Sequence, residues 1–355
     1  MTRDQATASI VGDRRARARF ASLCLVLLLA AVCVLSLAVG ASSASLFTAL
    51  HKLTVGEPLS RLEQVVLFDV RAPRLALGIL VGAALAVSGA VMQGLFRNPL
   101  ADPGLVGVGA GAGLGAVTAI VLGGLLPAAL GAALGVWLVP LAAFLGGWLS
   151  TIVLYRVSTR RGQTSVATML LAGIALGALA GAVTGILIYK ADDQQLRDLT
   201  FWGLGSLAGA TWPKVLVTGP MIIAAGIIAL TLAKGLNALA LGEATARHLG
   251  LNVERLKYAA ILTVAAATGA AVAVSGGIGF VGIVVPHLLR LATGPDHVML
   301  LPNAALLGAS LLLMADVIAR VIVAPAELPI GIVTAVLGAP VFLWILLRRR
   351  GMVDL

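Results

Sequence analysis

The residue types that most often carry enzyme chemistry do not stand at catalytic spacings in this chain. No lysine follows a glycine, so the sequence lacks the Gly-Lys-Ser/Thr loop that binds nucleotide phosphates. Ser88 and Ser275 each precede a glycine, but alanine stands two positions before them, where the nucleophile elbow of a hydrolase has glycine. The four histidines show no metal-ligand spacing. We therefore expect no catalytic residue, no bound metal and no cofactor on this chain.

A small group of polar and charged side chains lies at residues 235–258, here called the polar segment. It contains Glu243, Arg247, His248, Glu254, Arg255 and Lys257 within an otherwise apolar chain. A stretch of this length is too short to bury a core of its own. Its polar side chains are therefore predicted to rest on another protein, and a solvated loop is the alternative interpretation.

Composition indicates a polytopic membrane protein. The 355 residues are 60% hydrophobic and 11% charged, and the mean hydropathy is +1.05, whereas soluble chains carry about 25% charged residues. A bilayer core of about 30 Å needs roughly 20 apolar residues per helix. On that scale the sequence predicts an all-α fold with ten transmembrane helices, the eighth of them short, near residues 20–40, 74–95, 105–126, 135–155, 165–189, 214–234, 256–275, 278–291, 300–319 and 330–347.

The basic residues set the expected orientation. Clusters of Lys and Arg lie before the first span, after the fourth, around the polar segment and at 348–350. Because Lys and Arg are enriched in cytoplasmic loops, both termini and the polar segment are expected in the cytoplasm, and the net charge of +10 indicates a lipid bilayer rather than nucleic acid. The first span resembles a secretory signal, but the charge distribution favours an uncleaved helix. We expect a cytoplasmic tail at 1–19 and one transmembrane domain at 20–350.

An internal repeat favours transport. Residues 82–89 read GAALAVSG and residues 269–276 read GAAVAVSG, and a proline follows each copy ten residues later. Five helices separate the copies, so they are expected to cross the membrane in opposite directions, as the inverted repeats of transporters do. Asp316 is the one acidic residue predicted inside a span, and it stands four residues from Arg320, which predicts an intrahelical pair. An ion-coupled secondary transporter, which usually needs intramembrane ionisable groups, is the less favoured alternative.

Two further patterns point to a path through the protein. Four glycines recur at every fourth position and line one face of the predicted fifth helix: Gly173, Gly177, Gly181 and Gly185. This face is predicted either to pack tightly on another helix or to form a smooth wall of a substrate path. Residues 96–104 carry two prolines and polar groups at a depth where irregular backbone must line a cavity or be covered by protein. A gate is one interpretation of this loop, and a plain turn is the other.

Two long motifs make the chain resemble a known family. Residues 71–113, beginning RAPRLALGILVGAALAVSGAVMQGLFRNPLADPG, and residues 326–349, beginning AELPIGIVTAVLGAP, look like the FecCD-type permease subunits of type II ABC importers for iron chelates, haem and vitamin B12. The resemblance covers about residues 20–350. It implies a fold like that of the vitamin B12 importer permease and a permease homodimer in the bacterial inner membrane. The implied partners are two cytoplasmic ABC ATPases, which bind ATP and Mg, and a periplasmic substrate-binding protein.

The resemblance also assigns roles to residues at matching positions. Arg71, Arg74 and Arg320 would form an exposed external pocket for a carboxylate of the binding protein, because charge at a rim orients a partner. Anchoring at lipid headgroups is the alternative for the first two. The cytoplasmic gate would comprise Asn98, Pro99, Leu100, Thr164, Ser165 and Thr168. The polar segment would be the coupling helices, which contact the ATPase through Ala240, Glu243, Ala244, Arg247, His248 and Leu249.

Two details of the polar segment follow from its own residues. Ala240, Ala244 and Leu249 give a narrow apolar stripe suited to a groove of a partner. Gly250 is expected to end this helix, and Asn252 is expected to cap the next one.

The external stretch at residues 192–212 bears on the cargo. It resembles the haem-importing branch of the family, and the spacing of Leu196, Leu199 and Trp202 predicts a short amphipathic helix at the outer mouth. The expected function is ATP-driven import of haem by alternating access, with a ferric siderophore as the next candidate and cobalamin after it. ATP hydrolysis would belong to the partner subunit.

Overall fold

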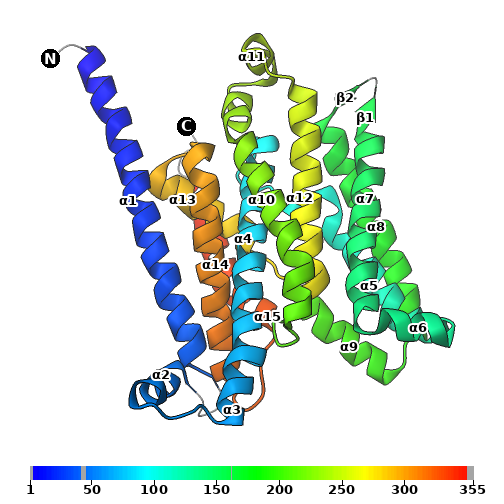
Figure 1. Cartoon of the computed structure of the whole chain (residues 1–355). Helices are drawn as coiled ribbons and strands as arrows, with labels where there is room; N and C mark the ends of the chain where they lie inside the picture. Colours follow the sequence, from blue (N-terminus) through cyan, green and yellow to red (C-terminus); the bar gives the residue numbers. More distant parts are fainter. Residues whose placement is uncertain (1–2, 41–44, 161, 350–355) are drawn as a thin grey trace.

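The chain folds into a bundle of helices, most of which run side by side (Figure 1). The computed structural model describes residues 3–40, 45–160 and 162–349. Within these residues, the helices that correspond to the ten predicted spans are α1 (Arg3–Ala38), α4 (Ala72–Leu95), α5 (Val108–Leu122), α7 (Leu138–Ser158), α8 (Val166–Lys190), α10 (Trp212–Ala240), α12 (Val253–Ser275), α13 (Val281–Thr293), α14 (His297–Val321) and α15 (Ile330–Arg349).

The predicted ten-helix membrane fold is confirmed. In the described part of the chain, eight helical segments are long and apolar enough to cross a bilayer, and Val281–Thr293 and Ile330–Trp344 are shorter apolar helices. The predicted short eighth span is α13. The first helix begins at Arg3, so the segment expected as a separate tail continues the helix of the first span.

Short helices without a counterpart among the predicted spans cover one end of the bundle, here called the outer end. They are α2 (Leu46–Val55), α3 (Arg61–Gln64) and α6 (Ala128–Leu134), with a π-helical turn at Val65–Arg71 and 3₁₀ turns at Gly123–Leu125 and Gly135–Trp137. At this end α9 (Asp193–Leu204) confirms the predicted amphipathic helix, and Leu199 is its buried residue. Asp192 and Gln195 form a capping box that begins the helix.

The opposite end, here called the inner end, carries the polar segment. There α11 (Glu243–His248) forms a separate short helix between α10 and α12. Two strands, β1 (Thr159–Arg160) and β2 (Gln163–Thr164), pair antiparallel at the same end. The start of α1 and the end of α15 also lie there (Figure 1). The termini and the polar segment therefore share one end, and its orientation toward the cytoplasm stays a prediction.

The centre of the bundle is α4, around which α10, α12, α13 and α14 pack. The first copy of the repeat brings backbones close together, since a Cβ at Gly82 would collide with Gly308 and one at Gly89 with Gly282. The helices of the two copies, α4 and α12, run in opposite directions (Figure 1), as expected for an inverted repeat. The matched prolines differ in role, because Pro99 lies in the loop after α4 whereas Pro286 lies inside α13.

Candidate functional site

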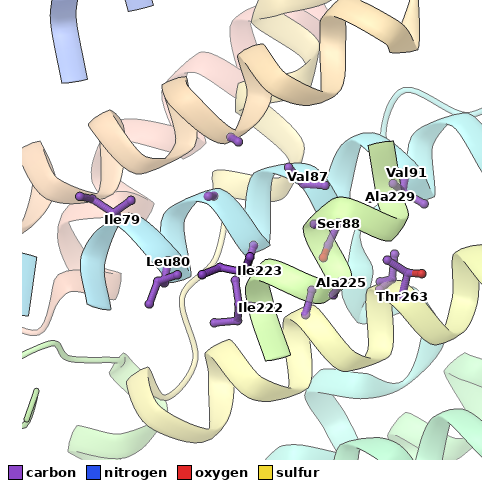
Figure 2. Close-up of a pocket in the computed structure, with 16 residues that line it drawn as sticks. Ile79, Leu80, Val87, Ser88, Val91, Ile222, Ile223, Ala225, Ala229 and Thr263 are labelled. Carbon is purple, nitrogen blue, oxygen red and sulfur yellow. The ribbon is translucent and has the colours of Figure 1, made fainter. Parts of the chain in front are cut away.

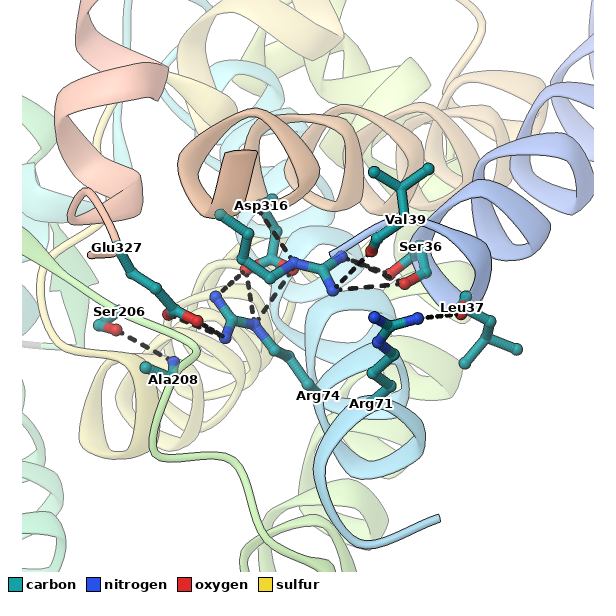
Figure 3. Close-up of polar contacts among 10 residues, drawn as sticks. Ser36, Leu37, Val39, Arg71, Arg74, Ser206, Ala208, Asp316 and Glu327 are labelled. Atoms are coloured by element: carbon teal, nitrogen blue, oxygen red, sulfur yellow. Dashed lines mark hydrogen bonds and ion pairs between the residues drawn. The ribbon is translucent and has the colours of Figure 1, made fainter. Parts of the chain in front are cut away.

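A cluster of charged side chains, here called the outer charge cluster, lies between α1, α4 and α14. Arg74 stands between two carboxylates (Figure 3): its Nε lies 2.9 Å from Asp316 Oδ1, and its Nη1 lies 2.9 Å from each oxygen of Glu327. Arg320 Nε lies 3.1 Å from Asp316 Oδ2, which confirms the predicted pair on α14. Two guanidinium groups thus share Asp316, which is fully buried. Removing either partner of a buried ion pair is costly, so this contact holds α4 against α14.

Further contacts of the guanidinium groups reach the end of α1. Arg71 Nη1 donates to the Leu37 carbonyl at 2.6 Å, and Arg320 donates to the Ser36 carbonyl at 3.3 Å. The expectation that Arg71, Arg74 and Arg320 are exposed at a rim is wrong, because they are only 4%, 5% and 5% exposed. Carboxylates and backbone carbonyls inside the protein already accept hydrogen bonds from these groups. Their role in docking stays a prediction, and it now requires that an internal contact be exchanged.

Glu327 is a member of the outer charge cluster that sequence reasoning missed. It lies in the loop between α14 and α15, and its side chain is 37% exposed, against 1% for Asp316. Glu327 is 253 positions from Arg74 in the chain, so no helical spacing could have paired them. The motif AELPIG contains this glutamate, and that motif drew attention only through the family resemblance.

At the inner end, the polar segment does not form the single apolar stripe that was predicted. Ala240 is the last residue of α10, and Gly242 turns the chain with φ +106° before α11 begins. Ala240 therefore lies on a different helix from Ala244, and the stripe through Leu249 is interrupted. All three side chains are nevertheless exposed. The exposed apolar surface also includes Leu241, which the sequence analysis left out.

The predicted helix boundaries in the polar segment are confirmed. Gly250 adopts φ +81° after α11, a conformation that glycine accepts without strain. Asn252 caps α12 by accepting the Arg255 N–H at 3.0 Å. His248 contacts its own helix, with Nδ1 2.8 Å from the Ala244 carbonyl oxygen.

Lys257 connects α11 with the hairpin at the inner end. Its ammonium lies 2.9 Å from Glu243 Oε1 and 3.2 Å from Glu254 Oε1, and it donates to the Thr164 carbonyl at 2.9 Å. Glu254 accepts the Thr164 N–H at 2.8 Å, and Arg247 lies 3.5 Å from Glu243 and 3.8 Å from Glu254. The Lys257 side chain is only 3% exposed. One buried cation thus joins α11, the start of α12 and the end of β2.

The two segments predicted to form the gate are each shaped by a side-chain hydrogen bond. Ser165 caps α8 by accepting the Thr168 N–H at 3.2 Å. Asn98 accepts the Leu100 N–H at 3.0 Å across Pro99, which stabilises a turn after α4. In the part of the chain that the structure describes, no hydrogen bond joins residues 98–100 to residues 164–168. Their action as one gate stays a prediction.

The loop after α4 also carries a carboxylate that sequence reasoning missed. Asp102 accepts the Gly104 N–H at 2.7 Å, at the start of the 3₁₀ turn Pro103–Val106. It lines a cavity of about 370 Å³ together with Trp202 and Thr268, whose hydroxyl is buried without a hydrogen-bond partner among the described residues. Asp102 is therefore a further carboxylate near the helix packing, besides Asp316. It was missed because it lies in a loop rather than in a predicted span.

The glycine face of α8 points away from the rest of the chain. Cβ atoms placed on Gly177, Gly181 and Gly185 would meet open space, and Gly173 is half-buried. Tight packing of these three glycines on another helix is therefore not observed within the described residues of this chain. That this face lines a substrate path stays a prediction.

A separate cavity of about 360 Å³ lies between α4, α10 and α12 (Figure 2). Apolar side chains such as Val87 and Ile222 form most of its wall, and Ser88 and Thr263 are its only hydroxyl-bearing residues. The wall contains no histidine and no carboxylate, so Ser88 has no neighbouring base within this cavity. This arrangement argues against a membrane-embedded hydrolase that uses Ser88.

Comparisons with known proteins agree with the fold. The FecCD transport family matches residues 4–348. The chain is 49% identical over 282 residues to the hemin transport system permease protein HmuU of Yersinia pestis, covering 79% of this chain and 83% of that protein. It is 44% identical over 297 residues to the vitamin B12 import system permease protein BtuC of Klebsiella pneumoniae, covering 83% and 86%. A solved structure described as an inward-facing conformation of a metal-chelate type ABC transporter has a TM-score of 0.80 and 34% identity, covering 92% of this chain and 98% of that one.

These matches extend over nearly the whole helical bundle rather than over one motif. The ten helices and the antiparallel repeat copies fit the fold that the two sequence motifs implied. The resemblance is confirmed on both grounds, and the chain belongs to the FecCD transport family of ABC-importer permease subunits.

Proposed function

We propose that this chain is the permease subunit of an ATP-driven importer that carries haem, or a related metal chelate, from the periplasm to the cytoplasm. The observation that carries the proposal is the 49% identity to a hemin permease, which exceeds the 44% identity to the vitamin B12 permease. A ferric siderophore and cobalamin are the next candidates for the cargo.

The proposed assembly contains two copies of the chain in the bacterial inner membrane, two cytoplasmic ATPases and a periplasmic binding protein. The exposed glycine face of α8 supports a substrate path or a contact between the two copies. Exposed Leu241 and Leu249 beside the charged residues of α11 support a contact with the ATPase, since clustered apolar side chains on a polar surface commonly mark an interface. ATP and Mg would bind to the partner subunits alone.

Alternating access would depend on the ionic connection at the inner end. Closure of the ATPases would displace α11, and the Glu243–Lys257 contact would transmit that displacement to Thr164 and so to the start of α8. Because α8 carries the glycine face, its tilt would change the width of the path. The permease would contribute binding and movement, and the partner would contribute bond chemistry.

Reconstitution into proteoliposomes tests the proposal. The chain is combined with candidate ATPases, and ATP hydrolysis and uptake are measured with the binding protein loaded with haem, with a ferric siderophore or with cobalamin. We expect haem-loaded binding protein to stimulate hydrolysis and haem to accumulate. If only cobalamin-loaded binding protein stimulated ATP hydrolysis, cobalamin would be the cargo in place of haem. Accumulation driven by a sodium or proton gradient without any ATPase would contradict the proposed class of transporter.

A further inference from the structure

Glu327 is the exchangeable member of the outer charge cluster. Arg74 directs Nε and Nη2 to Asp316, with Nη2 2.8 Å from Oδ1, and it directs Nη1 alone to Glu327. The Asp316 side chain is almost completely buried and is also paired with Arg320, whereas the Glu327 side chain reaches solvent. A partly exposed ion pair is weak, but a shared buried carboxylate is expensive to remove. A carboxylate that approaches from outside would therefore displace Glu327 rather than Asp316.

The charges of the outer charge cluster favour the binding of an incoming carboxylate. Among the described residues, its contacts involve three guanidinium groups and two carboxylates, so basic side chains outnumber acidic ones there. The members are Arg71, Arg74, Arg320, Asp316 and Glu327. Loss of Glu327 from its place would increase that excess in a poorly solvated site. An incoming carboxylate would restore the pairing of Arg74 Nη1 at little net cost, because it replaces a contact of the same chemistry.

The position of Glu327 gives the exchange a structural consequence. The following residue, Leu328, donates its N–H to the Ala319 carbonyl at 3.0 Å, and the Ile330 N–H is bonded to the Gly205 carbonyl at 3.0 Å. Gly331 lies so close to the Leu204 carbonyl that a Cβ would collide with it. The loop at residues 322–329 is thus held to α14 on one side and to the end of α9 on the other. Movement of Glu327 would pull on both contacts and on the start of α15.

We propose that Glu327 is a positioning residue that stands in for a carboxylate of the docking protein, and that docking exchanges one carboxylate for the other on Arg74. The exchange frees the loop at residues 322–329 and so signals docking to α9 and α15. This inference rests on the proposed function, because it requires a binding protein that docks at the outer end.

Binding measurements on the complete importer in nanodiscs test the exchange. The Kd for haem-loaded binding protein is compared between the wild type, Glu327→Gln and a matched control, Glu57→Gln. Glu57 is exposed at the outer end but lies outside the outer charge cluster, so its substitution removes the same charge without the Arg74 contact. We expect Glu327→Gln to bind about 3- to 5-fold more tightly, as loss of a partly exposed competing ion pair implies, and Glu57→Gln to change Kd by about twofold or less.

Hydrogen–deuterium exchange on the wild-type importer provides a second measurement that needs no variant. We expect amide exchange in residues 322–329 to increase when the binding protein docks. Unchanged or weaker binding by Glu327→Gln, or unchanged loop exchange on docking, would overturn the inference while the proposed function stands. If no candidate binding protein binds the wild type, the proposed docking fails and the exchange fails with it.

Discussion

Replacement of Lys257 by methionine tests whether α11 is mechanically connected to the hairpin. Methionine keeps an unbranched apolar side chain, one atom shorter, but removes the cation. The substitution eliminates two ion pairs, at 2.9 and 3.2 Å, and the hydrogen bond to Thr164 at 2.9 Å. We expect ATP hydrolysis to continue in Lys257→Met while cargo uptake per ATP decreases, because α11 would move without the gate segment.

The size of the effect follows from the burial of the three partners. A hydrogen bond to a charged group contributes about 1.5–3 kcal/mol. Glu243 and Glu254 are 32% and 26% exposed, and Arg247 lies near both, so solvent and that second cation offset part of the loss. A net cost of about 1.5–3 kcal/mol corresponds to roughly a 10- to 150-fold weaker connection. Uptake per ATP should therefore decrease by about tenfold or more.

The assay measures phosphate release and haem accumulation in the same proteoliposomes. Lys234→Met is the matched control, since Lys234 is exposed near the end of α10 and its substitution removes one positive charge from the same end. Size-exclusion profiles and Tm values establish that both variants fold. A folded Lys257→Met permease that transports as much cargo per ATP as the wild type would show that the three contacts do not connect α11 with the gate.

Four further substitutions separate packing from transport. Gly82→Val places a side chain against the Gly308 backbone and should lower stability by about 1–3 kcal/mol, visible as a reduced Tm. Asp316→Asn leaves the buried cationic groups of the outer charge cluster short of a counter-charge and should cost about 3–5 kcal/mol, measured as loss of folded protein on detergent extraction. In Gly181→Trp the new side chain would meet open space, so Tm should not change, but its bulk in the proposed substrate path should abolish haem uptake. Leu249→Asp, at an exposed position, should keep the permease folded but weaken co-purification of the ATPase by about tenfold.

Local patterns predicted the helices well. Apolar runs of about 20 residues found the spans because the bilayer sets a minimum helix length. The spacing of Leu196, Leu199 and Trp202 predicted α9 because burial of one helical face repeats with that period. The backbone freedom of Gly250 and the short side chain of Asn252 likewise determine a helix end within a few residues.

Contacts between distant segments escaped the same reasoning. Asp316 and Arg320 were paired correctly because they lie one helical turn apart. Arg74 was expected to be exposed because no local pattern predicted a partner for it. Its two carboxylate partners lie 242 and 253 positions away in the chain. Lys257 was recognised as one charge among several in the polar segment, but its contact with Thr164 crosses 93 positions. Residue type and predicted depth therefore located the charges without showing what each one contacts.

Burial of the outer arginines changes what the proposed docking would have to accomplish. Exposed cations at a rim would attract a partner without altering the permease, and contact alone would then carry no signal inward. Cations already paired inside the protein accept a new carboxylate only by releasing an old one, so binding and movement become the same event. The loop that holds Glu327 is bonded to Ala319 of α14 and, through Ile330, to Gly205 next to α9. In the proposed exchange, the release of one partly exposed contact would thus have a direct route to α9, which a simple electrostatic rim would lack.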